Sequence, residues 1–189
     1  MSFRHCDRPN RAAGLTPAAS VPVWGSFVRI FHWSLVIGFA VAFLSAQEFD
    51  RLHEWAGYVV AALVVGRLLW GFIGTRHARF SDFVRGPSET LRYLGDIVSG
   101  RERRYLGHNP AGAWMILAML AGMLSLGATG YLLSTGGPLG SEFFEELHEV
   151  IANAMLVLVV LHIAGVAISS FQTGENLAIA MITGWKRSE

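Results

Sequence analysis

The stretch FFEELHEVIANAMLVLVVLHIAGVAISSF, residues 143–171, is an almost continuous apolar run that contains two histidines. His148 and His162 are fourteen residues apart, nearly four turns at 3.6 residues per turn, so both imidazoles lie on one helix face. The rise between them is about 21 Å, which places one imidazole near each side of a hydrocarbon core of ~30 Å. A histidine inside a membrane span is costly and marks a functional site by default. The spacing therefore indicates two cofactors, one in each leaflet.

Three more apolar stretches precede this run, at residues 27–46, 52–72 and 113–133, and the fourth span itself covers residues 144–169. Each is near the ~20 residues that a membrane helix needs. Charged residues make up 15% of the chain, against about 25% in a typical soluble domain. The sequence predicts an all-α, integral membrane four-helix bundle. A soluble bundle of buried helices is the alternative, but four full-length spans seldom coincide in one soluble domain.

The charges are segregated between the ends of these spans. The two loops that join the first span to the second and the third to the fourth are acidic, with Arg51 as their one cation. The other segments are rich in arginine, and the positive-inside rule places them in the cytoplasm. Both termini are therefore expected in the cytoplasm of a multi-pass protein of the bacterial inner membrane. The basic residues on that side are Arg4, Arg8, Arg11, Arg29, Arg76, Arg79, Arg85, Arg92, Arg101, Arg103, Arg104, Lys186 and Arg187.

The segments outside the spans are expected to form a tail and short surface helices. Residues 1–21 have no apolar period and predict a flexible tail, which leaves residues 22–189 as the membrane domain. Pro87 opens a short amphipathic segment that Gly100 ends, which predicts a helix at the membrane interface. Asn109 and Pro110 predict the N-cap and first residue of the third span. Residues 176–185 predict another short helix.

Four histidines form depth-matched pairs within the predicted topology: His53 with His148 on the periplasmic side, and His32 with His162 on the cytoplasmic side. Neutral imidazole is a common axial ligand of haem iron, so two bis-histidine haems are the favoured cofactors. The only cysteine, Cys6, excludes a C-x-x-C-H attachment motif, so each haem would be held without a covalent bond. The remaining histidines, His5, His77 and His108, fall in polar segments and are expected to be solvated.

Two arginines are candidate cofactor contacts. Arg67 is an isolated cation within a span, fourteen residues after His53, so it is expected to lie at the depth of the inner haem and pair with a propionate. The alternative is that its long side chain snorkels to the interface. Arg51 is the single cation expected beside the outer haem.

The chain resembles the prokaryotic dihaem cytochrome b family, the b-561 group that includes the cytochrome b subunit of membrane nickel–iron hydrogenases. The resemblance covers about residues 21–187 and rests on Arg29-Ile-Phe-His32-Trp33, Leu52-His53-Glu54-Trp55, Leu147-His148-Glu149 and Leu161-His162. It implies two non-covalent b haems in a four-helix membrane bundle, electron exchange with quinone, and ligation by the same four histidines.

These features predict an electron-transfer subunit of a quinone-linked respiratory chain, embedded in membrane lipid, with no nucleic acid partner. Electrons would pass through the haems between quinone and a periplasmic c-type cytochrome or hydrogenase-like protein, and a basic partner would suit the acidic outer loops. Two alternatives stay open: a self-contained superoxide:quinone oxidoreductase, and a non-haem protein that uses the histidines for a metal or a proton relay.

Overall fold

Four long helices dominate the computed structural model, which describes residues 20–74, 79–101, 105, 107–136 and 141–187. All four are long and apolar enough to cross a membrane. The predicted spans are confirmed, with each helix extending one to four residues beyond most of the predicted limits. These helices are α1 (Ser26–Ser45), α2 (Asp50–Ile73), α5 (Pro110–Ser134) and α6 (Ser141–Thr173).

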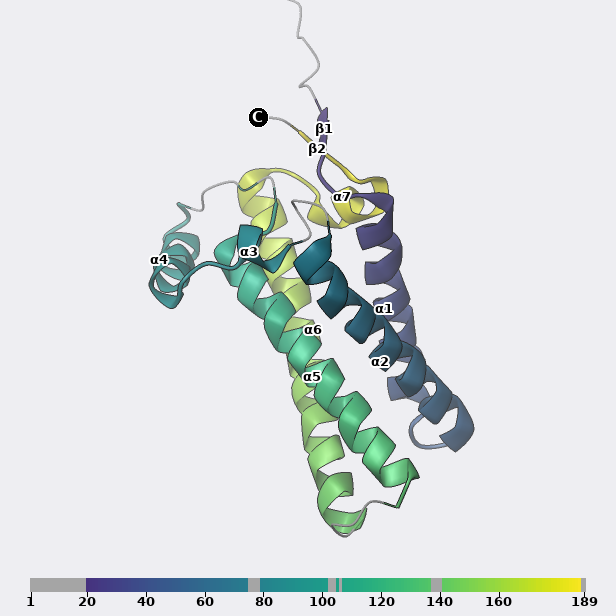
Figure 1. Cartoon of the computed structure of the whole chain (residues 1–189). Helices are drawn as coiled ribbons and strands as arrows, with labels where there is room; N and C mark the ends of the chain where they lie inside the picture. Colours follow the sequence, from purple (N-terminus) through teal and green to yellow (C-terminus); the bar gives the residue numbers. More distant parts are fainter. Residues whose placement is uncertain (1–19, 75–78, 102–104, 106, 137–140, 188–189) are drawn as a thin grey trace, which may run out of the picture.

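The long helices pack as an antiparallel bundle in which α1 lies against α2, α2 against α5, and α5 against α6 (Figure 1). A cluster of Val60, Val64, Leu120, Met123 and Met155 fills the middle of the bundle. Many large apolar side chains point outward from all four helices, as a lipid-facing surface requires. The all-α membrane bundle predicted from the sequence is confirmed.

Short elements gather at one end of the bundle (Figure 1). They are α3 (Phe80–Phe83), α4 (Pro87–Val98), α7 (Leu177–Thr183), β1 (Ser20–Pro22) and β2 (Trp185–Arg187). We call this the basic end, because most of the described lysine and arginine residues lie on or beside these elements. The opposite end carries the turns from α1 to α2 and from α5 to α6, and we call it the acidic end.

The predicted helix boundaries at the basic end are confirmed. Helix α4 begins at Pro87, and the chain leaves it through Gly100 at a φ of 65°. The side chain of Asn109 accepts a hydrogen bond from the amide of Gly112 and caps α5. Asn176 caps α7 in the same way, and Gly184 ends that helix at a φ of 89°.

A two-stranded antiparallel sheet joins the beginning and end of the described chain, with Val21 opposite Lys186. The carbonyl of Gly184 accepts hydrogen bonds from the amides of Val23 and Trp24, and Arg29 donates to the carbonyl of Thr183. The sheet places both described termini at the same end of the bundle, as four spans require. Strand β1 begins at Ser20, so residues 20 and 21 of the expected tail lie in this strand. The rest of that tail lies outside the described residues.

Candidate functional site

The structure brings together the histidine pairs that depth predicts. The rings of His53 on α2 and His148 on α6 have their centres 5.9 Å apart near the acidic end. The rings of His32 on α1 and His162 on α6 are 6.5 Å apart toward the basic end. Helix α5 contributes no histidine to either pair. We call these the outer pair and the inner pair.

The helices that carry the two rings of each pair are not close backbone neighbours. Close backbone packing connects α1 to α2, α2 to α5 and α5 to α6, while α6 is not among the closely packed neighbours of α1 or α2 within the described chain. The imidazoles of each pair thus meet across a wider separation than that of directly packed helices. Only two donors converge at each place, since no group of three or more His, Cys, Asp or Glu side chains occurs among the described residues.

Hydrogen bonds fix the orientation of both outer rings. Nδ1 of His53 lies 2.8 Å from the carbonyl oxygen of Ala42, and a carbonyl can only accept, so this nitrogen carries the hydrogen. Nδ1 of His148 lies 2.8 Å from Oγ1 of Thr129, whose own hydroxyl donates to the carbonyl of Ser125. With its hydrogen given to Ser125, the Thr129 oxygen is able to accept a hydrogen bond from Nδ1–H of His148. With the hydrogen on Nδ1, Nε2 is the nitrogen of each ring that can act as a metal ligand.

A glycine gives the outer pair space on the α5 side. A Cβ atom built at Gly130 would lie 3.4 Å from Cε1 of His148, which is already a tight contact. The glycine therefore leaves this side of the imidazole without a side-chain contact from position 130.

The inner pair has a different environment. Nδ1 of His32 is buried and has no hydrogen-bond partner among the described residues. The same holds for Nη1 of Arg67, a side chain that is only 5% exposed. The guanidinium carbon of Arg67 lies 5.1 Å from the ring centre of Phe80 on α3, a cation–π contact. The side chain is thus covered by α3 within the described structure, in contrast to the snorkelling alternative.

Arg67 stands at the level of the inner pair by simple helix geometry. Helices α2 and α6 run in the same direction, and the spacing from His53 to Arg67 equals that from His148 to His162. Since the rings of His53 and His148 lie side by side, Arg67 is level with His162 about 21 Å further along the bundle. Arg51, by contrast, is an exposed residue in the first turn of α2.

A packed apolar layer separates the two pairs. Val60 and Met155 each lie seven residues after an outer histidine, midway along the bundle, and both belong to the central cluster. Met155 is 1% exposed, and its sulfur closely approaches the position that a Cβ atom would take at Gly122. The two sites are therefore distinct compartments.

The prediction that His108 is solvated is wrong. Its ring lies 4.6 Å from that of Trp24 and 4.7 Å from that of Phe83, measured between centres, and its Nδ1 is buried. The hydrophilic loop sequence concealed this contact, because Trp24 and Phe83 are far from His108 along the chain. His5 and His77 lie outside the described residues.

A family model described as prokaryotic cytochrome b561 matches residues 23–184. The chain belongs to this family. As a cytochrome b561, it is an integral membrane protein that binds b-type haem and transfers electrons.

Individual relatives agree with this assignment. A probable Ni/Fe-hydrogenase B-type cytochrome subunit from Rhodobacter capsulatus is 24% identical in an alignment that covers 87% of this chain and 80% of the relative. A protein of the same description from Azotobacter chroococcum mcd 1 is 23% identical over 88% of each chain. A third, from Rhizobium leguminosarum bv. viciae, is 24% identical over 87% of this chain and 88% of its own. No solved structure matches significantly.

The two compartments of this cytochrome b561 fit a b-type haem. A metal–imidazole bond is about 2 Å long, so two rings on opposite sides of one metal have centres roughly 6 Å apart. Both observed ring separations are close to that value. A porphyrin supplies four nitrogens of its own, which suits compartments with two protein donors. Its propionates would also provide an anionic partner for the buried guanidinium of Arg67.

Several residues of these compartments could not be found from the sequence. Thr129 is a polar residue in a span without charged groups, and this was the one available signal that it has a hydrogen-bonding role. The Ala42 carbonyl and the Phe80 ring gave no signal, because their roles depend on contacts between separate helices.

Proposed function

We propose that this cytochrome b561 carries electrons across the membrane through two b haems, between a redox protein at the acidic end and quinone at the basic end. The observation that carries the proposal is the presence of two histidine pairs in separate compartments of one membrane bundle. A single pair would bind one haem near one surface only. Two pairs, about 21 Å apart by helix rise, give each half of the membrane its own electron carrier.

His53 and His148 would hold the iron of the outer haem, and His32 and His162 would hold that of the inner haem. Haem bound there supplies a reversible one-electron couple. Two protein ligands on each iron leave no open coordination position for oxygen or another substrate, which favours electron transfer. The protein holds the outer rings in the ligand tautomer through Ala42 and Thr129. Arg67 supplies positive charge at the inner site.

The basic end is proposed to face the cytoplasm of a bacterium and the acidic end the periplasm. Arginines dominate the first, and the second exposes seven carboxylates with only Arg51 as a described cation. A tag fused to either terminus should be protected from protease in intact cells and cleaved in inverted vesicles. Cleavage of a C-terminal tag in intact cells would reverse the orientation and exchange the two haem sides.

The acidic end is the proposed docking surface for the redox partner, which would present basic residues. The relatives named as hydrogenase cytochrome subunits favour a hydrogenase-like partner, and a c-type cytochrome has the same electrostatic requirement. The exposed carboxylates are Glu48, Asp50, Glu54, Glu142, Glu145, Glu146 and Glu149.

Haem stoichiometry and quinol reactivity test this function directly. The purified full-length protein should contain two haems b per chain with low-spin spectra, by the pyridine haemochrome assay and optical spectroscopy. A reduced quinone analogue should reduce both haems under anaerobic conditions. One haem per chain would contradict the two-site arrangement. Two haems that no quinol or quinone can reduce or oxidise would contradict the proposed substrate.

A further inference from the structure

We infer that α4 is a binding element for anionic lipid headgroups of the cytoplasmic leaflet. This surface lies outside the haem compartments, beside the first turns of α5 (Figure 1). The inference depends on the proposed orientation only for the name of the leaflet.

One face of α4 is fixed to the bundle. Tyr93 is 3% exposed and Thr90 is 9% exposed on this face. The side chain of Gln172 on α6 donates a hydrogen bond of 3.1 Å to the carbonyl of Ile97. The helix is therefore held at one place on the bundle.

The neighbouring face of α4 is apolar and exposed. Leu91, Leu94 and Val98 are spaced at three and four residues and share this face, with exposures of 69%, 43% and 88%. Nothing in the described chain covers them. A bilayer is the natural occupant, because the four spans embed the bundle in lipid at this same end.

An aromatic residue marks the level of the membrane interface next to α4. Trp114 lies in the second turn of α5 and is 42% exposed. Its indole nitrogen donates a hydrogen bond of 3.1 Å to the carbonyl of Arg85, two residues before α4. Tryptophan concentrates at the headgroup region of membranes, so this contact places the start of α4 at headgroup depth.

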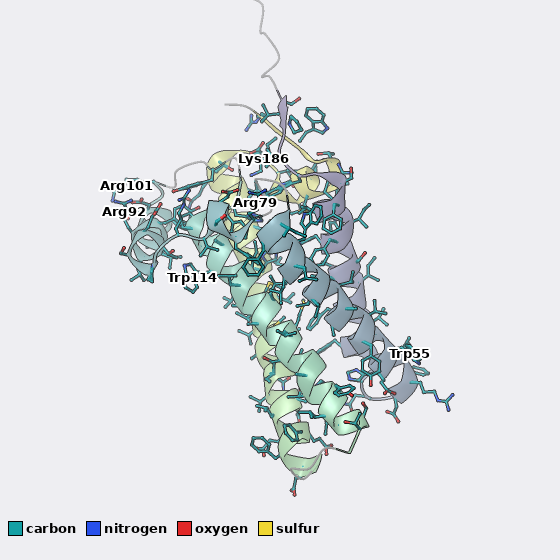
Figure 2. The ribbon with its side chains drawn as sticks, in the orientation of Figure 1. Trp55, Arg79, Arg92, Arg101, Trp114 and Lys186 are labelled. Atoms are coloured by element: carbon teal, nitrogen blue, oxygen red, sulfur yellow. The ribbon has the colours of Figure 1, made fainter. Side chains whose placement is uncertain are left out.

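Exposed arginines lie on α4 and next to its two ends. Arg85, Arg92 and Arg101 are exposed, and Figure 2 shows Arg92 and Arg101 on the outer side of α4, on the same side of the bundle as Trp114. Glu89 and Asp96 on α4 are more covered and lie with Arg92 and Tyr93 around a small surface pocket. Arg85, Arg92 and Arg101 outnumber these two carboxylates by one, so residues 85–101 carry a net positive charge, which complements a lipid phosphate with net negative charge, such as that of phosphatidylglycerol.

Lipid retention tests the charge requirement. Native mass spectrometry of the full-length, haem-loaded protein should show more bound phosphatidylglycerol than phosphatidylcholine with the same acyl chains. Arg92→Gln should reduce this preference by roughly five-fold, the value for one basic residue near a membrane surface. Arg51→Gln is the matched control, since it removes an exposed cation at the opposite end, and it should leave the preference unchanged. Equal retention of both lipids by the unmodified protein, or an unaltered preference in Arg92→Gln, would overturn the inference.

Depth measurements test the apolar face separately. In a Cys6→Ser background, nitroxide labels at Val98→Cys and Asp96→Cys report opposite sides of α4, about 160° apart around the helix, in vesicles containing phosphatidylglycerol. The Val98 label should collide more with oxygen than with a water-soluble nickel chelate, and the Asp96 label should show the reverse. A Val98 label reached mainly by the nickel chelate would place this face in water. A label shielded from both reagents would mean that protein, such as a second copy of this chain, covers the face, and either result overturns the inference.

Discussion

The outer and inner histidine pairs are the same donor set in two different settings. At the outer pair, protein acceptors at Ala42 and Thr129 fix the hydrogen on Nδ1 of both rings. At the inner pair, Nδ1 of His32 and Nη1 of Arg67 are buried without partners among the described residues. The outer compartment is therefore organised by the protein alone, whereas the inner compartment has polar atoms that a bound anionic group would satisfy.

This difference divides the two sites by function. Hydrogen bonds to the outer imidazoles set their orientation and their strength as ligands. A buried cation at the inner site instead acts on the charge of the cofactor. We expect substitutions at the outer site to alter mainly the affinity for haem. We expect substitution of Arg67 to alter mainly the reduction potential of the inner haem.

Removal of a ligand should have the largest effect and tests whether the two sites are separate. His148→Ala should lose the outer haem and keep the inner one, and His162→Ala should do the opposite. Each substitution removes an iron ligand and leaves the opposing imidazole without its partner. The pyridine haemochrome assay should fall from two haems per chain to one, while His5→Ala should keep both. Two low-spin haems in the His148→Ala protein would refute the assignment of ligands.

Helix periodicity explains why the histidine pairs could be predicted. A fourteen-residue spacing fixes face and depth in any regular helix. His148 and His162, and likewise His53 and Arg67, could therefore be located from the sequence. The amphipathic pattern and proline of α4 were equally local signals.

Contacts between distant segments could not be predicted in this way. The hydrogen bond from His148 to Thr129 depends on the rotation of α5 against α6, and the placement of Phe80 over Arg67 depends on the path of the chain after α2. The pairing of β1 with β2 joins segments at opposite ends of the chain, and three residues in each strand give too short a pattern to detect.

Loss of the acceptor at Thr129 should have an intermediate effect, confined to the outer site. Thr129→Val keeps the shape of the side chain and removes the oxygen that accepts from His148, so outer haem affinity should fall by roughly 10–100-fold. The outer reduction potential should rise slightly, because the imidazole becomes a weaker electron donor. Haem release to an acceptor protein measures the affinity of each site.

A neighbouring hydroxyl provides the control for this change. Ser125 is exposed on the same helix, and its hydroxyl donates only to the Ala121 carbonyl of α5 itself. Ser125→Ala should therefore leave both haems unchanged. Faster loss of the inner haem than of the outer one from Thr129→Val would remove the basis for the contrast between the sites.

Substitution of Arg67 should have the smallest effect of the three changes. It should act on the reduction potential of the inner haem. Reduction adds an electron to the haem site, and a nearby cation favours that state, so Arg67→Leu should lower the inner reduction potential. The shift should be some tens of millivolts for a separation of ~8–10 Å at an effective dielectric constant near ~20. The outer haem, about 21 Å away by helix rise, should shift much less.

Arg67→Lys keeps the charge and should retain most of the native potential, while Arg51→Leu removes an exposed cation and should leave the inner potential unchanged. A redox titration that resolves the two haems distinguishes these outcomes. Equal shifts of both haems, or none at the inner one, would show that the buried guanidinium serves packing against Phe80 and does not tune the cofactor.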